Sequence, residues 1–196
     1  MEGKGRRGHL EPVSGTGSTC HQRSRMLKAG QWLPGFEARR LPGHALDFWA
    51  GAPERIASRD LTSDSPALLA VVKRDCPTCL YALPFFERLY GLHGGLAPVI
   101  LVAQENEVGA GRMVQDHRLK IPVLLDEEPH LIGEELEVSF VPGVFLVSPG
   151  GEIELSFESF ERESLREIHQ RLSRMSGRPE TVFYQEDEVV DAFRPG

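Results

Sequence analysis

Residues 67–92 read ALLAVVKRDCPTCLYALPFFERLYGL, and they carry the clearest structural pattern in the chain. Its first six residues, 67–72, are all apolar, which is typical of a central strand that is buried on both faces. Over residues 79–92 the apolar side chains recur at helical spacing, and nearby glycines are suited to end a helix. The pattern therefore predicts a buried strand that leads, through two cysteines, into a helix.

Predicted strands and helices alternate in the rest of the chain. Short strands or a hairpin are expected between residues 31 and 65, notably at 36–38 and 45–49, where Pro-Gly turns separate short apolar pieces. Strand–helix–strand connections join parallel strands through right-handed crossovers. We therefore predict an α/β fold whose central sheet is mixed but mainly parallel and is flanked by helices. Further strands are expected at 98–103, 122–125, 143–147 and 152–157, and further helices at 106–118, 128–137 and 162–175.

The charge balance and the cysteine count narrow the classes of function. The 196 residues include 22 Lys and Arg against 29 Asp and Glu, a net charge of −7, which is unsuited to a general nucleic-acid binder. No stretch approaches the ~20 apolar residues that a transmembrane helix needs. Three cysteines are too few for a small domain held together by disulfides. We therefore expect neither nucleic acid nor a membrane as a partner.

Composition divides the chain into three regions. Residues 1–26 are net basic and nearly free of apolar side chains, so they are expected to form a disordered arm. Residues 27–178 are expected to form the folded domain, and residues 179–196 an acidic C-terminal tail. No apolar segment follows the basic N-terminus, which argues against a secretory signal and predicts a cytoplasmic location.

The motif Cys76-Pro77-Thr78-Cys79 carries the chemistry. Two cysteines three positions apart at the start of a helix place both sulfurs at the same end, within bridging distance. The unpaired N–H groups and partial positive charge of a helix N-terminus favour a thiolate there, and proline suits the first helical position. We therefore expect Cys76 to attack a substrate disulfide and Cys79 to resolve the resulting mixed disulfide.

The sequence resembles the thioredoxin superfamily over about residues 29–175, in its TlpA/ResA-like or AhpC/TSA-like (redoxin) branch. Pro84, five positions after Cys79, matches a kinking proline of the active-site helix, and Val141-Pro142 matches the position of the family's cis-proline. The resemblance implies a thioredoxin-like fold with extra N-terminal strands and one inserted βα unit. It also implies that the backbone of Val141 is presented to the substrate chain. Three segments are similar to the pattern of this branch: LPGFEARRLPG (33–43), PVLLD (122–126) and VPGVFLVSPGGEI (141–153).

The sequence departs from this family at positions that matter for proton transfer. Asp75 stands where thioredoxin has tryptophan, Ala70 where it has a buried aspartate, and Ala82 where ResA-like proteins have a glutamate. No carboxylate base of the family is therefore in place for Cys79. Lys73 and Leu69 replace the residues of the peroxiredoxin motif, so peroxidase activity is not expected.

Together, the motif and the resemblance predict a thiol-disulfide oxidoreductase. Its expected partners are a disulfide-bearing protein substrate and a thiol reductant; it is expected to be a monomer and to need no cofactor or metal. Two alternatives stay open: a thioredoxin-fold module that binds proteins and has inert cysteines, and a metal-binding CxxC protein. The predicted site residues are the catalytic Cys76 and Cys79, and the active-site loop and cis-proline residues Pro77, Thr78, Val141 and Pro142.

Overall fold

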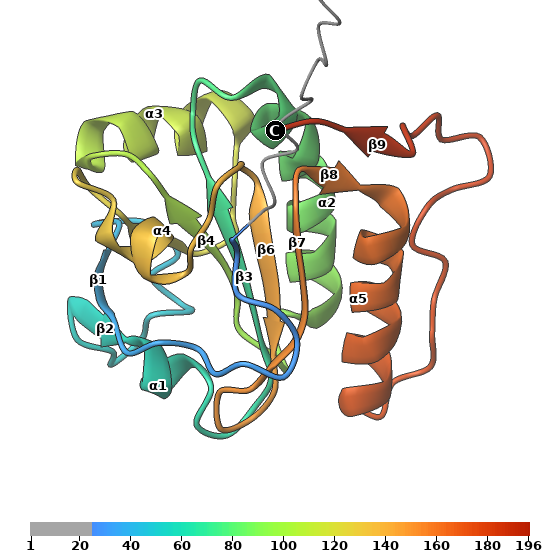
Figure 1. Ribbon diagram of the computed structural model, residues 1–196, viewed down its shortest axis with the longest axis horizontal. Coiled ribbons are helices and arrows are strands. Elements are labelled where there is room, and N and C mark those ends of the chain that lie inside the picture. The colour runs from blue at the N-terminus through green and yellow to red at the C-terminus, as the bar shows by residue number, and fades with distance from the viewer. Residues whose placement is uncertain (1–24) are drawn as a thin grey trace, which may run out of the picture.

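A computed structural model describes residues 25–196 (Figure 1). Nearly all of the expected basic arm lies outside the described residues, but its last residue, Met26, is buried in the core. None of the described helices is long and apolar enough to cross a membrane. The strands are β1 (Glu37–Arg40), β2 (Arg55–Ala57), β3 (Ala67–Val72), β4 (Val99–Ala103), β5 (Val123–Leu125), β6 (Gly143–Val147), β7 (Ile153–Glu158), β8 (Phe160–Glu161) and β9 (Phe193–Arg194). The helices are α1 (Ser58–Leu61), α2 (Pro77–His93), α3 (Glu107–His117), α4 (Leu131–Glu135) and α5 (Arg162–Met175).

Seven strands form one mixed sheet in the order β2-β1-β5-β4-β3-β6-β7. The pairs β3–β4 and β4–β5 are parallel, and the other four pairs are antiparallel. Five strands (β2, β5, β4, β3 and β7) consequently run in one direction, with β1 and β6 opposed. The predicted fold class, an α/β fold with a mixed central sheet flanked by helices, is confirmed.

One predicted strand, at 45–49, is wrong. These residues form successive turns, in which the N–H of Trp49 donates to the carbonyl of Ala45 at 3.1 Å and that of Ala52 to Trp49 at 2.9 Å. Local bonds of this kind satisfy the backbone within the segment, so it has no need of a strand partner. The hairpin partner of β1 is instead β2, which begins at Arg55.

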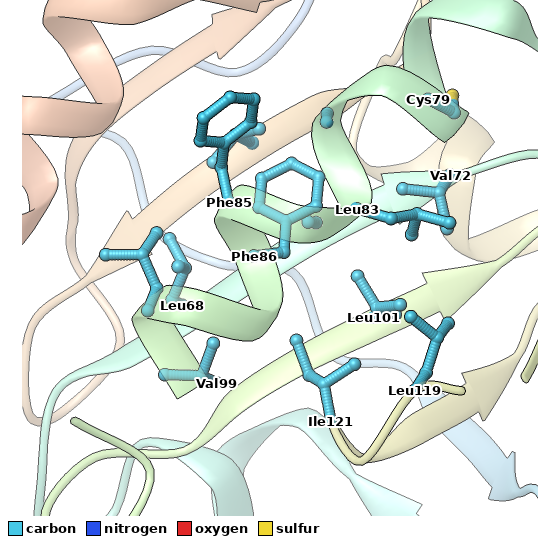
Figure 2. Packing of buried hydrophobic residues seen from close by; sticks show 14 of the residues in the cluster. Leu68, Val72, Cys79, Leu83, Phe85, Phe86, Val99, Leu101, Leu119 and Ile121 are labelled. Atoms are coloured by element: carbon cyan, nitrogen blue, oxygen red, sulfur yellow. The ribbon is translucent and has the colours of Figure 1, made fainter. Parts of the chain in front are cut away.

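The run 67–72 is buried on both faces of the sheet, as predicted. Leu68, Ala70 and Val72 point into a core shared with α2, α3 and α5, shown in part in Figure 2. The alternate residues Leu69 and Val71 point into a second core, with α1, α4 and the N-terminal segment. Because side chains alternate between the faces of a strand, a continuous apolar run serves two cores at once.

The C-terminal region after α5 folds back across the domain rather than projecting from it. In Figure 1 it follows α5 and ends beside the start of α2. Phe183 is only 3% exposed and belongs to the core that lies under α2 and α5. Further along, β9 pairs antiparallel with β8. The predicted acidic tail, residues 179–196, is therefore packed against the domain in this structure.

Candidate active site

The site begins where β3 ends and α2 starts. Cys76 is the N-cap of α2, with extended backbone, and Pro77 takes the first helical position, as predicted. The backbone N–H of Cys79 donates to Cys76 Sγ at 3.2 Å. The sulfur thus replaces the Ser, Thr or Asp oxygen that usually caps a helix, and it receives one of the otherwise unpaired N–H groups.

The two cysteines differ in exposure. Cys76 is half-buried, whereas Cys79 is 1% exposed and part of the hydrophobic core (Figure 2). Burial raises the pKa of the Cys79 thiol well above its ordinary value, and the hydrogen bond with Cys76 and the charge of Asp75 add to this effect. Both are free thiols that lie close together without being bonded. Cys76 is thus the accessible sulfur, and Cys79 is the one that keeps its proton.

The loop before β6 meets the cysteines from the other side. Strand β6 runs antiparallel to β3, and Gly143 pairs with Val71, so the start of β6 lies beside the end of β3. The peptide bond between Val141 and Pro142 is cis, the geometry that the resemblance implied. The thiol of Cys76 donates to the Val141 carbonyl oxygen, with 3.6 Å between sulfur and oxygen. The structure therefore brings Cys76, Val141 and Pro142 together.

Two carboxylates that sequence reasoning missed hold these loops. Glu158 Oε1 accepts from the backbone N–H groups of Ser139 at 2.5 Å and Phe140 at 3.0 Å, just before Val141. Glu105 Oε1 accepts from the N–H of Arg74 at 3.1 Å, in the turn before Cys76. Each carboxylate lies far in the sequence from the N–H groups that it binds, so no local pattern predicts these contacts.

Thr78 has a partner that the sequence did not predict. Its hydroxyl donates to the carbonyl oxygen of Pro195 at 2.5 Å. The next residue, Gly196, lies against the carbonyl of Val141 and donates its N–H to Ser159 Oγ at 3.0 Å. The end of this chain therefore lies at the CPTC motif. The apolar residues at 182–184 were a signal that the tail packs somewhere, but no local signal shows where.

The surroundings of Cys79 include two alanines at positions where the proteins that the sequence resembles have carboxylates. Ala70 and Ala82 are both buried in the same apolar cluster as Cys79. They provide no proton acceptor, and they contribute to the burial that keeps Cys79 protonated. Among residues 25–196, no group of three His, Cys, Asp or Glu side chains is arranged to hold a metal ion.

No family model and no curated protein sequence matches the chain. Solved structures do match. The thioredoxin domain of a thiol-disulfide oxidoreductase from Bacteroides vulgatus is 15% identical with a TM-score of 0.60, and the match covers 74% of this chain and 97% of that one. This chain has the thioredoxin fold. A putative thiol:disulfide interchange protein DsbE from Chlorobium tepidum is 17% identical with a TM-score of 0.63, over 77% of this chain and 99% of that one.

A third thioredoxin-fold match is a disulfide oxidoreductase from Mycobacterium tuberculosis that is described as secreted. It is 15% identical with a TM-score of 0.53, over 71% of this chain and 95% of that one. At identities this low the likeness concerns the fold. What the site does must be argued from its own residues.

Proposed function

We propose that this protein is a thiol-disulfide oxidoreductase. One observation carries the proposal: an accessible sulfur and a buried one lie at the start of α2, and the accessible one faces the carbonyl that precedes a cis-proline. A thiol that accepts an N–H at a helix N-terminus is suited to be a nucleophile, and a second thiol three residues later is suited to displace it. The alternatives with inert or metal-bound cysteines do not call for this arrangement.

The proposed cycle transfers two electrons to the substrate. The Cys76 thiolate attacks one sulfur of a substrate disulfide, that bond breaks, and the departing sulfur takes up a proton as a free thiol. Cys79 then loses its proton and attacks Cys76 Sγ. The mixed disulfide breaks, a Cys76–Cys79 disulfide forms, and the second substrate thiol is released. An external thiol reductant restores the two enzyme thiols by the reverse exchange.

The proton of Cys79 controls the second half of this cycle. Its raised pKa follows mainly from burial, and Ala70 and Ala82 supply no base. We propose that the proton leaves to water before the attack, so that the rate follows the thiolate fraction of Cys79. Resolution of the mixed disulfide is then the slow step near neutral pH.

The test is the reduction potential of the Cys76/Cys79 pair. The full chain with Cys20→Ser, which removes the third cysteine, is equilibrated in glutathione or dithiothreitol buffers, alkylated and weighed by mass spectrometry. We expect a reversible two-electron couple that is lost in Cys76→Ser and in Cys79→Ser. A value near about −270 mV would identify a reductant, and one near about −120 mV an oxidant. If no disulfide forms at any potential, the oxidoreductase proposal is wrong, and the alternatives with inert or metal-bound cysteines are favoured instead.

The physiological setting is also proposed. We propose a disulfide-bearing protein substrate, a thiol reductant, a monomeric state and a cytoplasmic location. A reducing compartment suits a protein that delivers electrons to disulfides. Sedimentation of the purified chain tests the monomeric state, and fractionation of the source cells tests the location.

A further inference from the structure

The last residues of the chain form a strand beside the site. Strand β9 pairs with β8 in the antiparallel direction, with Phe160 opposite Arg194 and Glu161 opposite Phe193. The N–H of Arg162 donates to the carbonyl of Ala192 at 3.1 Å. Strands β8 and β9 form a two-stranded sheet of their own, and main-chain pairing is also the means by which extended peptides bind to strands. The segment 192–196 is thus held in the manner of a bound peptide.

This segment also contacts the two polar groups that flank the sulfur of Cys76. Pro195 accepts from the hydroxyl of Thr78, which stands between the two cysteines. A Cβ added to Gly196 would collide with the Val141 carbonyl oxygen, which also receives the Cys76 thiol. The segment therefore lies between the CPTC motif and the cis-proline loop, where a substrate disulfide would have to approach.

We propose that residues 192–196 occupy, within the same chain, the groove that receives an extended segment of the protein substrate. A substrate must then displace them before its disulfide reaches Cys76. This inference rests on the proposed function, and it adds that the site is covered in its resting state. A tethered segment acts at high effective concentration, so weak contacts suffice to keep it in place.

The contacts along the tail indicate which part can lift. Arg88 makes a two-pronged ion pair with Glu188, at 2.8 Å for each bond, and Tyr184 donates to the Arg162 carbonyl at 2.9 Å. Together with buried Phe183, these contacts fix residues 183–188 to α2 and α5.

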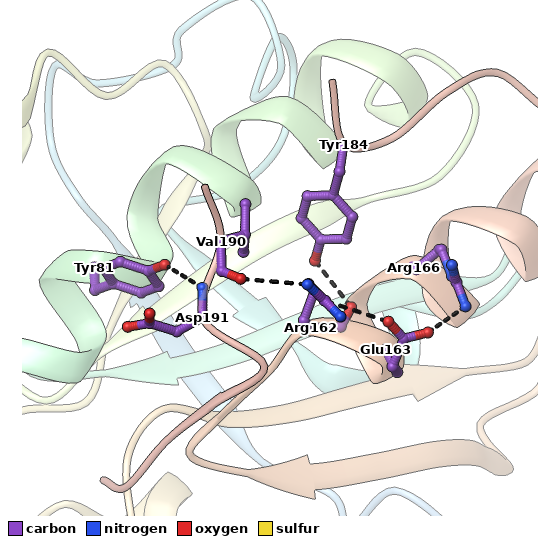
Figure 3. Close-up of polar contacts among 7 residues, drawn as sticks. All are labelled: Tyr81, Arg162, Glu163, Arg166, Tyr184, Val190 and Asp191. Carbon is purple, nitrogen blue, oxygen red and sulfur yellow. Dashed lines mark hydrogen bonds and ion pairs between the residues drawn. The ribbon is translucent and has the colours of Figure 1, made fainter. Parts of the chain in front are cut away.

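Beyond this anchor the side chains of the tail are more exposed, and its hydrogen bonds are mostly made by the main chain. The N–H of Asp191 donates to the Tyr81 hydroxyl at 2.9 Å, as Figure 3 shows. The Arg194 guanidinium lies 4.2 Å from the Tyr81 ring centre and pairs with Asp191 at 3.1 Å. Both side chains of that ion pair are partly exposed, and such pairs contribute little. Phe193 is 57% exposed. Residues 192–196 can therefore release while the anchor at 183–188 holds.

Two substitutions in the full chain test whether residues 192–196 cover the site. Gly196→Val places a side chain where the Val141 carbonyl blocks it, and Arg194→Ala removes the contact with Tyr81. Matched controls are Gly95→Val, at a glycine where an added Cβ would meet nothing within 4 Å, and Arg59→Ala, whose partner Asp60 is also on the surface.

Three rates are compared in the Cys20→Ser background. They are exchange of the Arg162 amide hydrogen, alkylation of Cys76 by iodoacetamide, and reaction of Cys76 with a disulfide-bearing protein, for which insulin is the probe. We expect all three to rise in Gly196→Val and Arg194→Ala, by about fivefold, the factor that ~1 kcal/mol of lost contact gives. The two control variants should match the parent.

The outcomes separate this inference from the proposed function. Faster amide exchange and faster alkylation without any reaction with insulin would support the cover and count against the oxidoreductase. Faster amide exchange with unchanged alkylation and unchanged reaction would overturn the cover and leave the oxidoreductase standing. Unchanged amide exchange in both variants would also overturn it, because residues 192–196 would then not depend on these contacts.

Discussion

Cys76 and Cys79 sit three residues apart, yet their surroundings assign them different steps. Cys76 receives an N–H and is only half-buried, whereas Cys79 lies in the apolar core with its pKa raised by burial. A thiol attacks as the thiolate. Cys76 is therefore suited to the first attack, and Cys79 can attack only after it has lost its proton.

The first prediction concerns the pH dependence of resolution. With a raised pKa, the thiolate fraction of Cys79 grows tenfold for each pH unit, so release of the second substrate thiol should accelerate about tenfold per unit, with no plateau up to about pH 9. An unperturbed thiol would level off near its pKa of about 8.5. The measurement is stopped-flow release of a chromophoric thiol from a mixed disulfide preformed on Cys76.

The control for this prediction is Cys79→Ser. This variant should form the mixed disulfide stoichiometrically and then stall, with turnover lowered at least about hundredfold. A pH-independent resolution rate, or turnover that survives Cys79→Ser, would show that Cys79 is not the resolving thiol.

At the scale of elements, a histidine pair joins α2 to α5. His93 Nε2 and His169 Nδ1 are 2.9 Å apart, and His169 Nε2 lies 2.9 Å from the carbonyl oxygen of Thr181. A carbonyl only accepts, so His169 donates through Nε2 and accepts through Nδ1 from His93. His93 Nδ1 is then unprotonated and buried, and it has no hydrogen-bond partner among residues 25–196. A proton added there would be a buried charge.

The second prediction is that this pair makes stability sensitive to acid. Burial, with the nearby His169 and Arg178, lowers the pKa of His93 from 6.5 to about 4. Its contribution to stability is therefore complete above the unfolded-state pKa and is lost as the pH falls toward the folded-state value. Linkage gives a loss of about 2 kcal/mol between about pH 7 and about pH 5. Urea unfolding of the parent at each pH measures the change.

The matched variant for this prediction is His93→Gln, which retains a donor for His169 and has no basic nitrogen. Its free energy of unfolding should fall less than the parent's over the same pH range, even if it is lower at pH 7. An equal loss in parent and variant would mean that other groups cause the acid sensitivity.

The elements also show where local patterns suffice. The run 67–72 and the helix after Cys76 each carry a pattern within a few residues, and the structure has β3 and α2 at these places. The cis peptide bond before Pro142 was expected from the resemblance and not from a local pattern. The expected strand at 45–49 failed because a short apolar piece fits a turn as well as a strand. The hairpin partner of β1 is β2, which is only three residues long and too short to show an alternating pattern.

At the scale of the whole molecule, residues 179–196 join the domain through Phe183. Its ring stacks on His169, with 5.2 Å between ring centres, and packs in the core under α2 and α5. The neighbouring Val182 is 71% exposed. The tail thus has one buried anchor next to a side chain that faces solvent.

The third prediction compares these two neighbours. Phe183→Ala should lower the free energy of unfolding by about 3 kcal/mol, because it leaves a cavity in the core. Val182→Ala should change it by less than about 0.5 kcal/mol. Denaturant unfolding of the full chain measures both. Equal, small effects would indicate that the tail docks without contributing to the stability of the domain.

The central strand, the cysteine pair at a helix start and the alternation of strands and helices could be predicted from the sequence alone. These are local properties, set by side-chain period and by the conformations open to proline and glycine. Only the tertiary structure decided the burial of Cys79, the contact between His93 and His169, and the position of Gly196 against Val141. Thr78 and Pro195 are 117 positions apart, and a contact at that separation exists only once the sheet and helices have packed.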